Sequence, residues 1–257
     1  MVGQAGTRVC PLSYLADCRL SSVNSPDNTP SPSAEPEKLV APLWHTALVL
    51  LLMGAMAMRS YYSSGLIAPE HSSRIARYLT TIVIEWTLVG VVIFGIRRTG
   101  TTLRQLIGGD WSTSKSFFRD LGIGIVFLIG SFVMLGIVGH VLHAETPASV
   151  KGFLPHTLPE KSLWMFLALT AGICEEIITR GYLQRQLTAL LKSAPAGIAA
   201  QGVIFGLAHV YQGWAHVFII ILLGCMLGIL AYWRKSLRPG IIEHFLQDAL
   251  GGLAGGR

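Results

Sequence analysis

The sequence predicts an all-α membrane protein, a polytopic transmembrane bundle of about six spans with a short cavity-lining helix at its C-terminal end. Three observations support this fold class. Of the 257 residues 51% are apolar, only 13% are charged, and the mean hydropathy is +0.53. Soluble globular domains carry about 25% charged residues, so this chain has roughly half the charge expected of a protein dissolved in water. The apolar residues come in blocks rather than at amphipathic spacing, which argues against a soluble enzyme with a large core.

The N-terminal 38 residues differ from the rest of the chain. They contain no continuous apolar run, and four prolines lie among serines, asparagines and acidic residues between positions 21 and 38. Such a segment buries too little apolar area to offset its conformational entropy, so we expect residues 1–38 to be a disordered tail. Residues 39–257 would then form the transmembrane domain.

Apolar runs define the expected membrane helices. A helix needs about 20 mostly apolar residues to cross the hydrocarbon core. The runs that come close to this length are 40–58, 78–96, 121–142, 163–178, 194–210 and 217–233. A seventh run, 239–254, is short and contains Glu243, His244 and Asp248, so we interpret it as the cavity-lining helix.

Charge in the connections predicts the orientation. Eleven Lys and Arg residues lie in 97–119, 180–192 and 234–238, and five lie in the alternate connections. Cytoplasmic loops hold the excess of Lys and Arg, which places the N-terminal tail in the cytoplasm. As a separate expectation, we place the protein in a bacterial inner membrane. The net charge of +6 is therefore explained by loop location, and we expect no nucleic-acid partner. Membrane lipid is the expected surrounding, and the oligomeric state stays open.

Two pairs of glycines predict close helix packing. Gly202 and Gly206, and likewise Gly224 and Gly228, are four residues apart in the fifth and sixth predicted spans. Small residues at this spacing let two membrane helices approach each other closely, so we interpret both pairs as packing features.

Three motifs place ionisable residues where a membrane helix should have none. In the first, Glu176 and Arg180 are four residues apart and can pair on one helix face, whereas the adjacent Glu175 points about 100° away. A carboxylate without a counter-charge in an apolar site suits a general base. An intrahelical ion pair beside an interfacial glutamate is the competing interpretation.

The second and third motifs add two histidines. Phe205 and His209 share one face of the fifth span at a spacing of four residues. In the last helix Asp248 lies one turn from His244 and could fix the tautomer of its ring. Taken singly, each histidine has a simpler interpretation as a polar residue at a helix end.

Together the motifs resemble those of the CPBP family, the CAAX prenyl protease and bacteriocin-processing group also called Abi. The family pattern is EExxxR, then FxxxH, then HxxxN or HxxxD. The matching residues are Glu175, Glu176, Arg180, Phe205, His209, His244 and Asp248. The resemblance covers about the last 100 residues, with the motifs inside 163–254.

This resemblance implies an intramembrane endopeptidase that cuts a peptide bond near the cytoplasmic membrane face. Glu175 and His209 would activate a water, and Glu176 and Arg180 would hold the site together. His244 and residue 248 would stabilise the oxyanion. Because an ionised Asp cannot donate a hydrogen bond as Asn does, Asp248 would either orient His244 or act in its protonated form.

The resemblance also implies a peptide or protein substrate, and the sequence leaves open whether that substrate is prenylated. Phe205 would contribute to substrate binding. A metal is not required, since no His-Glu-x-x-His spacing is present, although Glu175, His209, His244 and Asp248 are a plausible set of zinc ligands.

Two other functions remain as alternatives. One is a non-catalytic membrane scaffold or bacteriocin-immunity protein that keeps the family fold. The other, a small transporter, would require internal repeats, and we find none. Glu85 lies inside the second predicted span, and its expected depth places it away from the three motifs, with either a packing role or a partner on a neighbouring helix. The sequence ends soon after the third motif, which leaves open a further membrane helix.

Overall fold

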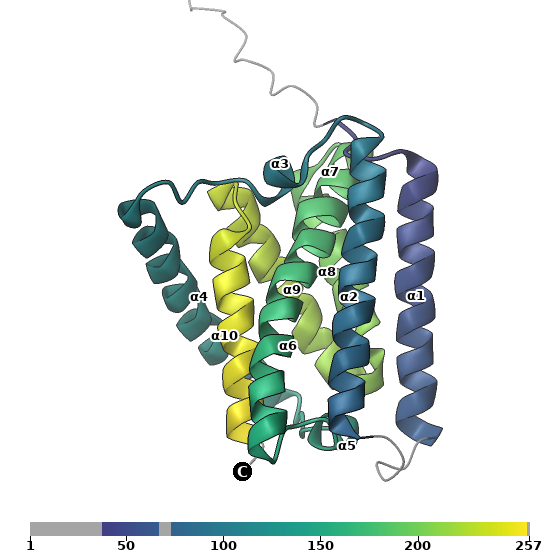
Figure 1. Ribbon diagram of the computed structural model, residues 1–257, viewed down its shortest axis with the longest axis vertical. Coiled ribbons are helices and arrows are strands. Elements are labelled where there is room, and N and C mark those ends of the chain that lie inside the picture. The colour runs from purple at the N-terminus through teal and green to yellow at the C-terminus, as the bar shows by residue number, and fades with distance from the viewer. Residues whose placement is uncertain (1–37, 67–72, 256–257) are drawn as a thin grey trace, which may run out of the picture. The chain divides into compact units, whose positions relative to one another are not determined.

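The computed structural model describes residues 38–66 and 73–255. The disorder expected of residues 1–38 therefore concerns residues that, apart from Lys38, lie outside the described part. The longer helices of the membrane domain are α1 (Leu43–Leu66), α2 (Arg74–Arg97), α4 (Ser114–Val141), α6 (Leu158–Glu176), α7 (Gln184–Leu191), α8 (Ala194–Ala208), α9 (Trp214–Arg234) and α10 (Arg238–Gly255). Short helices in the connections are α3 (Leu103–Ile107), α5 (Ala148–Lys151) and the 3₁₀ turn η2 (Val210–Gln212). Figure 1 shows the long helices side by side with alternating directions.

Five of the described helical segments are long and apolar enough to cross a membrane. They correspond to the first, second, third, fourth and sixth predicted spans, which confirms the predicted helical membrane bundle. The fifth predicted span, 194–210, is an apolar helix of 15 residues that ends at Ala208. At 1.5 Å per residue α8 is about 22 Å long, shorter than a hydrocarbon core of about 30 Å.

The fourth span is much longer than its apolar run. The segment Leu158–Leu191 is one continuous helical stretch of 34 residues that joins α6, the π-helix η1 (Ile177–Leu183) and α7. The prediction ended this helix at residue 178, because Arg180 and the polar residues after it resemble a helix end facing water. In the structure η1 is buried at every residue, so the charged motif lies in the middle of the helix rather than at its end.

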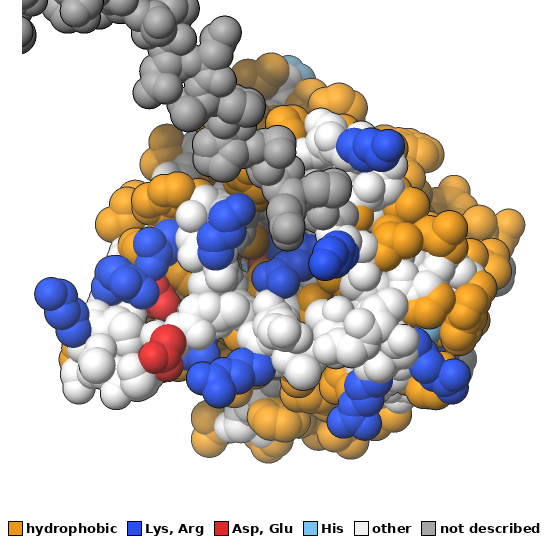
Figure 2. All heavy atoms as spheres, turned by 90° about the horizontal axis from the view of Figure 1, so that it is seen from above, with side chains coloured by type: hydrophobic (Ala, Val, Ile, Leu, Met, Phe, Trp, Pro, Cys, Tyr) orange, Lys and Arg blue, Asp and Glu red, His pale blue; other side chains and the backbone are white. Residues whose placement is uncertain are grey.

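Positive charge gathers at one end of the bundle. We call it the α3 end, because α3 lies there together with the last turns of α2, α7 and α9 and the first turn of α10 (Figure 1). Seen from this end, Lys and Arg side chains are frequent and acidic side chains are few (Figure 2). Residues 98–102 and 235–237, from two of the three predicted Lys- and Arg-rich connections, lie at this end, as does the short turn after α7. Arg180, which the prediction counted with the third connection, is buried inside the long helix.

Glycines bring α8 and α9 into close contact. A Cβ atom on Gly202 would lie 2.6 Å from Cys225 Sγ, and one on Gly206 would lie 2.7 Å from the carbonyl oxygen of Val217. On the facing helix, a Cβ on Gly224 would lie 3.0 Å from the Cα of Gly202. The glycine spacing therefore serves helix packing, as predicted.

A second close contact joins α6 to α10. A Cβ atom on Gly172 would lie 3.0 Å from the backbone nitrogen of Phe245. Nearby, the indole Nε1 of Trp164 donates to the carbonyl oxygen of Asp248 at 3.0 Å. These contacts hold α10 against the part of α6 that precedes the charged motif.

The α8–α9 contact yields a prediction for stability. Replacing Gly206 by Val inserts a side chain where no space exists, so we expect the free energy of unfolding to fall by about 1–3 kcal/mol, as in other overpacked cores. Thermal unfolding of the purified protein in detergent measures the effect.

Gly130→Val in α4 is the matched control, because a Cβ at Gly130 meets nothing within 4 Å. Equal unfolding temperatures for the two variants would contradict the close packing of α8 on α9.

Candidate active site

A buried ion pair forms the base of the site. Arg180 Nη1 lies 2.8 Å from Glu176 Oε1, and both side chains have 0% exposure. This is the pair that the spacing of the first motif predicts. Arg180 also donates to Thr179 Oγ1 at 2.8 Å and, through Nη2, to the carbonyl oxygen of Gly224 at 3.4 Å. The arginine thus links the π-helix to α9.

The second oxygen of Glu176 packs against α10. A Cβ atom on Gly240 would lie 2.9 Å from Glu176 Oε2, so any larger residue at this position would push against the carboxylate. Glu176 Oε2 has no hydrogen-bond partner among the described residues. The carboxylate is therefore held through Oε1, by two partners.

The second partner of Glu176 is His244. The ring Nδ1 lies 3.2 Å from Glu176 Oε1, within hydrogen-bond range, and the side chain is 5% exposed. Since an ionised carboxylate only accepts hydrogen bonds, this contact places a proton on Nδ1. From the sequence, Asp248 was a residue that could fix the tautomer of His244. In the structure the residue in contact with Nδ1 is Glu176, which lies 68 positions earlier in the chain.

The other nitrogen of His244 faces two more carboxylates. Nε2 lies 3.6 Å from Glu175 Oε2 and 3.8 Å from Asp248 Oδ2, too far for normal hydrogen bonds. The side chains of Glu175 and Asp248 are 23% and 36% exposed, in contrast to the fully buried Glu176. These two carboxylates are therefore accessible, as a group that reacts with a substrate or a water must be.

Phe205 joins the parts of the site. Its ring lies under the guanidinium of Arg180 at 4.3 Å, and its centroid is 4.9 Å from the ring of His209 and 6.1 Å from that of His244. Phe205 is only 3% exposed. The substrate contact that the motif implied for Phe205 stays a prediction, and the contacts in the structure show a ring packed between Arg180 and the two histidines.

His209 lies at the end of α8, where it is the C-cap residue. Its Nδ1 contacts the carbonyl oxygen of Phe205 at 2.8 Å, so the proton is on Nδ1 and Nε2 is the basic nitrogen. Asp248 interacts electrostatically with His209. The structure thus brings Glu175, Glu176, Arg180, His244 and Asp248 into direct contact and connects His209 to them through Phe205.

Glu85 belongs to the same region, and its predicted distance from the motifs is wrong. It is 8% exposed, and it interacts electrostatically with Glu175, Asp248 and His244. The prediction failed because it took residue 163 as the start of the fourth span. The helix begins at Leu158 and extends to Leu191, so Glu175 lies near its middle, as Glu85 lies near the middle of α2.

Tyr211 is a further residue that the motifs did not reveal. It follows His209 in η2, and the two ring centroids are 6.1 Å apart. Burial raises the pKa of the Tyr211 phenol to about 12, and the charges of Glu175 and Asp248 contribute to the increase. The phenol therefore keeps its proton at neutral pH and can donate a hydrogen bond. The only signal in the sequence is its position two residues after the histidine of the second motif.

The described residues contain no group of three or more His, Cys, Asp and Glu side chains arranged to hold one metal ion. The groups present are instead those of acid–base chemistry. Two accessible carboxylates face one imidazole, a basic imidazole nitrogen lies nearby, and a buried arginine–glutamate pair supports them. Such a set can take a proton from water and stabilise a developing negative charge.

Comparison with known proteins agrees with this chemistry. Residues 158–250, that is 93 of the 257, match the family model described as type II CAAX prenyl endopeptidase Rce1-like. No curated protein and no solved structure matches the chain. The matched region runs from the start of α6 into α10 and contains all three motifs. The chain is thus an integral, multi-pass membrane protein whose residues 158–250 are similar to the Rce1-like protease family, in agreement with the resemblance of the three motifs.

Proposed function

We propose that this protein is a glutamate-dependent intramembrane endopeptidase that hydrolyses a peptide bond near the cytoplasmic membrane face, in substrates of the CAAX type. The observation that carries the proposal is the contrast between two neighbouring glutamates. Glu176 is fully buried and paired with Arg180, whereas Glu175 is 23% exposed and faces His244. One carboxylate supports the site, and the other is available for chemistry.

In the proposed reaction Glu175 and His209 take a proton from a water molecule, and the water oxygen attacks the scissile carbonyl carbon. The resulting oxyanion lies near His244 and Asp248. Collapse of the tetrahedral intermediate breaks the C–N bond, and the proton passes to the leaving amine. Glu176 and Arg180 take no proton and keep His244 in place through the contact with Nδ1.

The structure also supports a choice between the two roles that the motif left to Asp248. Since Glu176 already holds the tautomer of His244, a carboxylate at 3.8 Å is not needed for that purpose. We propose that Asp248 acts in its protonated form and donates a hydrogen bond to the oxyanion. The phenol of Tyr211 is a second donor in the same region.

The first prediction concerns Glu175. Because Gln cannot accept the proton from water, Glu175→Gln should lower kcat by about 10²–10⁴-fold, the usual contribution of a general base. Purified protein in detergent is assayed on a panel of quenched peptides with prenylated and unprenylated members, with and without a chelator.

Glu145→Gln, in an exposed connection away from the motifs, is the matched control and should cleave like the wild type. Cleavage that disappears in chelator and returns with zinc would replace the metal-free mechanism by one in which Glu175 and the histidines are ligands. A Glu175→Gln protein that retains full activity in the assay and complements a deletion strain would refute the catalytic role and favour the scaffold.

The second prediction concerns Asp248. Asn donates a hydrogen bond at every pH, whereas Asp donates only while protonated. Asp248→Asn should therefore keep cleavage within a few-fold of wild type at low pH and exceed wild type at high pH, where wild-type Asp248 has lost its proton. Asp248→Ala, which cannot donate, should be slow at all pH values.

The measurement is the pH dependence of kcat/KM for the three proteins. If Asp248→Asn is as slow as Asp248→Ala throughout, the ionised carboxylate itself is required, and the donor role is wrong.

A further inference from the structure

The first helix is joined to the centre of the bundle by a network of buried polar side chains that the proposed reaction does not use. The network links α1 and the segment before it to α2, to the π-helix η1 and to α7. Its members, none of them more than 5% exposed, are His45, Thr46, Tyr182 and Gln186. The match to the protease family begins at residue 158, so the part of the network in α1 and α2 lies outside the matched region.

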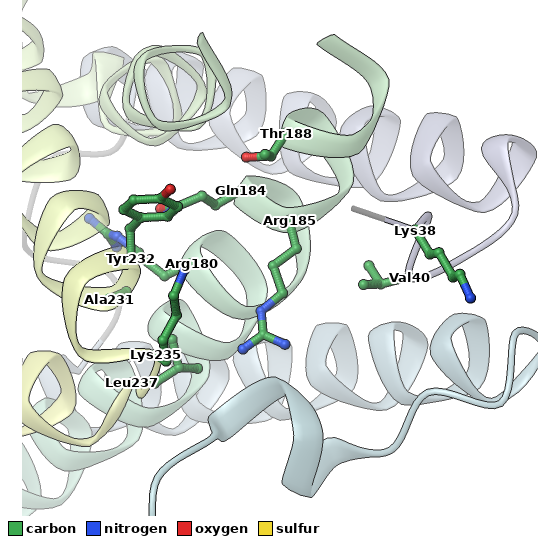
Figure 3. A pocket seen from close by; sticks show the side chains of 10 residues that line it. All are labelled: Lys38, Val40, Arg180, Gln184, Arg185, Thr188, Ala231, Tyr232, Lys235 and Leu237. Carbon is green, nitrogen blue, oxygen red and sulfur yellow. The ribbon is translucent and has the colours of Figure 1, made fainter. Parts of the chain in front are cut away.

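Gln186 in α7 binds the segment that precedes α1. Its Oε1 accepts from the backbone nitrogens of Val40 and Ala41 at 2.9 and 3.2 Å. Its Nε2 donates to the carbonyl oxygen of Ala41 at 2.8 Å and to Thr46 Oγ1 at 2.9 Å. The amide thus uses two acceptor and two donor positions, which is all that a glutamine side chain offers. Figure 3 shows Val40 on this segment, beside the helix that carries Arg185.

The contacts of His45 fix the direction of a hydrogen-bond chain. Nε2 lies 2.9 Å from the carbonyl oxygen of Val91 in α2, and a carbonyl oxygen only accepts, so the ring proton is on Nε2. Both ring nitrogens meet neutral groups and the side chain is fully buried, so a second proton would create an unpaired buried charge. Nδ1 therefore accepts, and the hydroxyl of Tyr182 at 2.8 Å donates to it.

The chain continues through Thr46. Because the single hydroxyl proton of Tyr182 goes to His45, the Tyr182 oxygen accepts from Thr46 Oγ1 at 3.2 Å. The other acceptor near Thr46, the carbonyl oxygen of Pro42, is farther away at 3.5 Å. Thr46 Oγ1 in turn accepts from Gln186. An ordered chain of hydrogen bonds thus runs from α7 to α1, from α1 to the π-helix, back to α1 and on to α2.

Tyr182 and the arginine of the site belong to the same π-helix. π-Helices are rare and are mostly single turns, so contacts from other helices are needed to keep one of seven residues. On one side Arg180 pairs with Glu176 and donates to a carbonyl oxygen of α9. On the other side α1 holds the hydroxyl of Tyr182. The register of the helix at Arg180 is therefore set from both sides.

We propose that α1 is a working part of the active site, because the hydrogen-bond chain that it forms with Tyr182 sets the register of the π-helix. In that register Arg180 meets Glu176, and Glu176 in turn contacts Nδ1 of His244. Tyr182 and the two side chains from α1 are positioning residues, since they act on His244 only through this ion pair. Their effect on cleavage rests on the proposed function, whereas the chain and its effect on the His244 ring do not.

The test compares Tyr182→Phe, which removes only the hydroxyl, with Tyr62→Phe. Tyr62 lies in α1, is 59% exposed and takes no part in the chain, so it is a matched control. The full-length protein, labelled with ¹⁵N in its histidines, is purified in detergent. Nitrogen NMR signals report which ring nitrogen of each histidine carries a proton, and the same samples are assayed for kcat and KM on the quenched peptides.

In the wild type we expect the proton on Nε2 of His45 and on Nδ1 of His244. Tyr182→Phe should change the signals of both rings, and Tyr62→Phe should change neither. Tyr182→Phe should also lower kcat by about 10–100-fold at an unchanged KM, since a shift of about 1 Å in a supporting group slows a reaction to this extent. Thr46→Val removes the donor to Tyr182 and should act in the same direction, so it replaces Tyr182→Phe if that variant does not fold.

A wild-type His45 ring with its proton on Nδ1, or with two protons, would overturn the chain. If the His244 signals and kcat of both chain variants stay as in the wild type, α1 only supports the fold, and the positioning role is wrong. If the wild type itself cleaves no peptide while Tyr182→Phe changes the His244 signals, the proposed function loses support and the positioning of His244 stands.

Discussion

The buried pair between Glu176 and Arg180 is the interaction on which the rest of the site depends. An unpaired charge inside a membrane protein costs several kcal/mol, so each of these groups requires the other. Their neighbours then follow from the need to accommodate two charges without water. Gly240 leaves room for the carboxylate, Phe205 offers a ring face to the guanidinium, and a carbonyl of α9 accepts from it. Glu176 is the last residue of α6, and Arg180 lies in the π-helix that follows it.

A second consequence is that adjacent residues acquire different chemistry. Glu175 and Glu176 are one position apart, but a helix turns about 100° per residue, so they point to different surroundings. Glu176 is buried and contacts Arg180 and His244 through Oε1, whereas Glu175 faces the imidazole across a longer distance and keeps some access. Asp248 and Glu85 bring two further carboxyl groups from two other helices. When four carboxyl groups lie close to few cations, some of them hold a proton and others do not. A site of this kind can both accept and donate protons, as hydrolysis requires.

The sequence by itself determined the class of the fold, most of the spans, the glycine contacts and the identity of the motif residues. These depend on local properties, namely the length of apolar runs, small-residue spacing and spacing along a helix. Tertiary structure alone decided that the fourth helix continues to Leu191, that Glu176 rather than Asp248 holds His244, and that Glu85 and Tyr211 join the site. Those outcomes depend on which faces of separate helices meet. Helix rotation and depth are set by packing over the whole bundle, and no single segment encodes them.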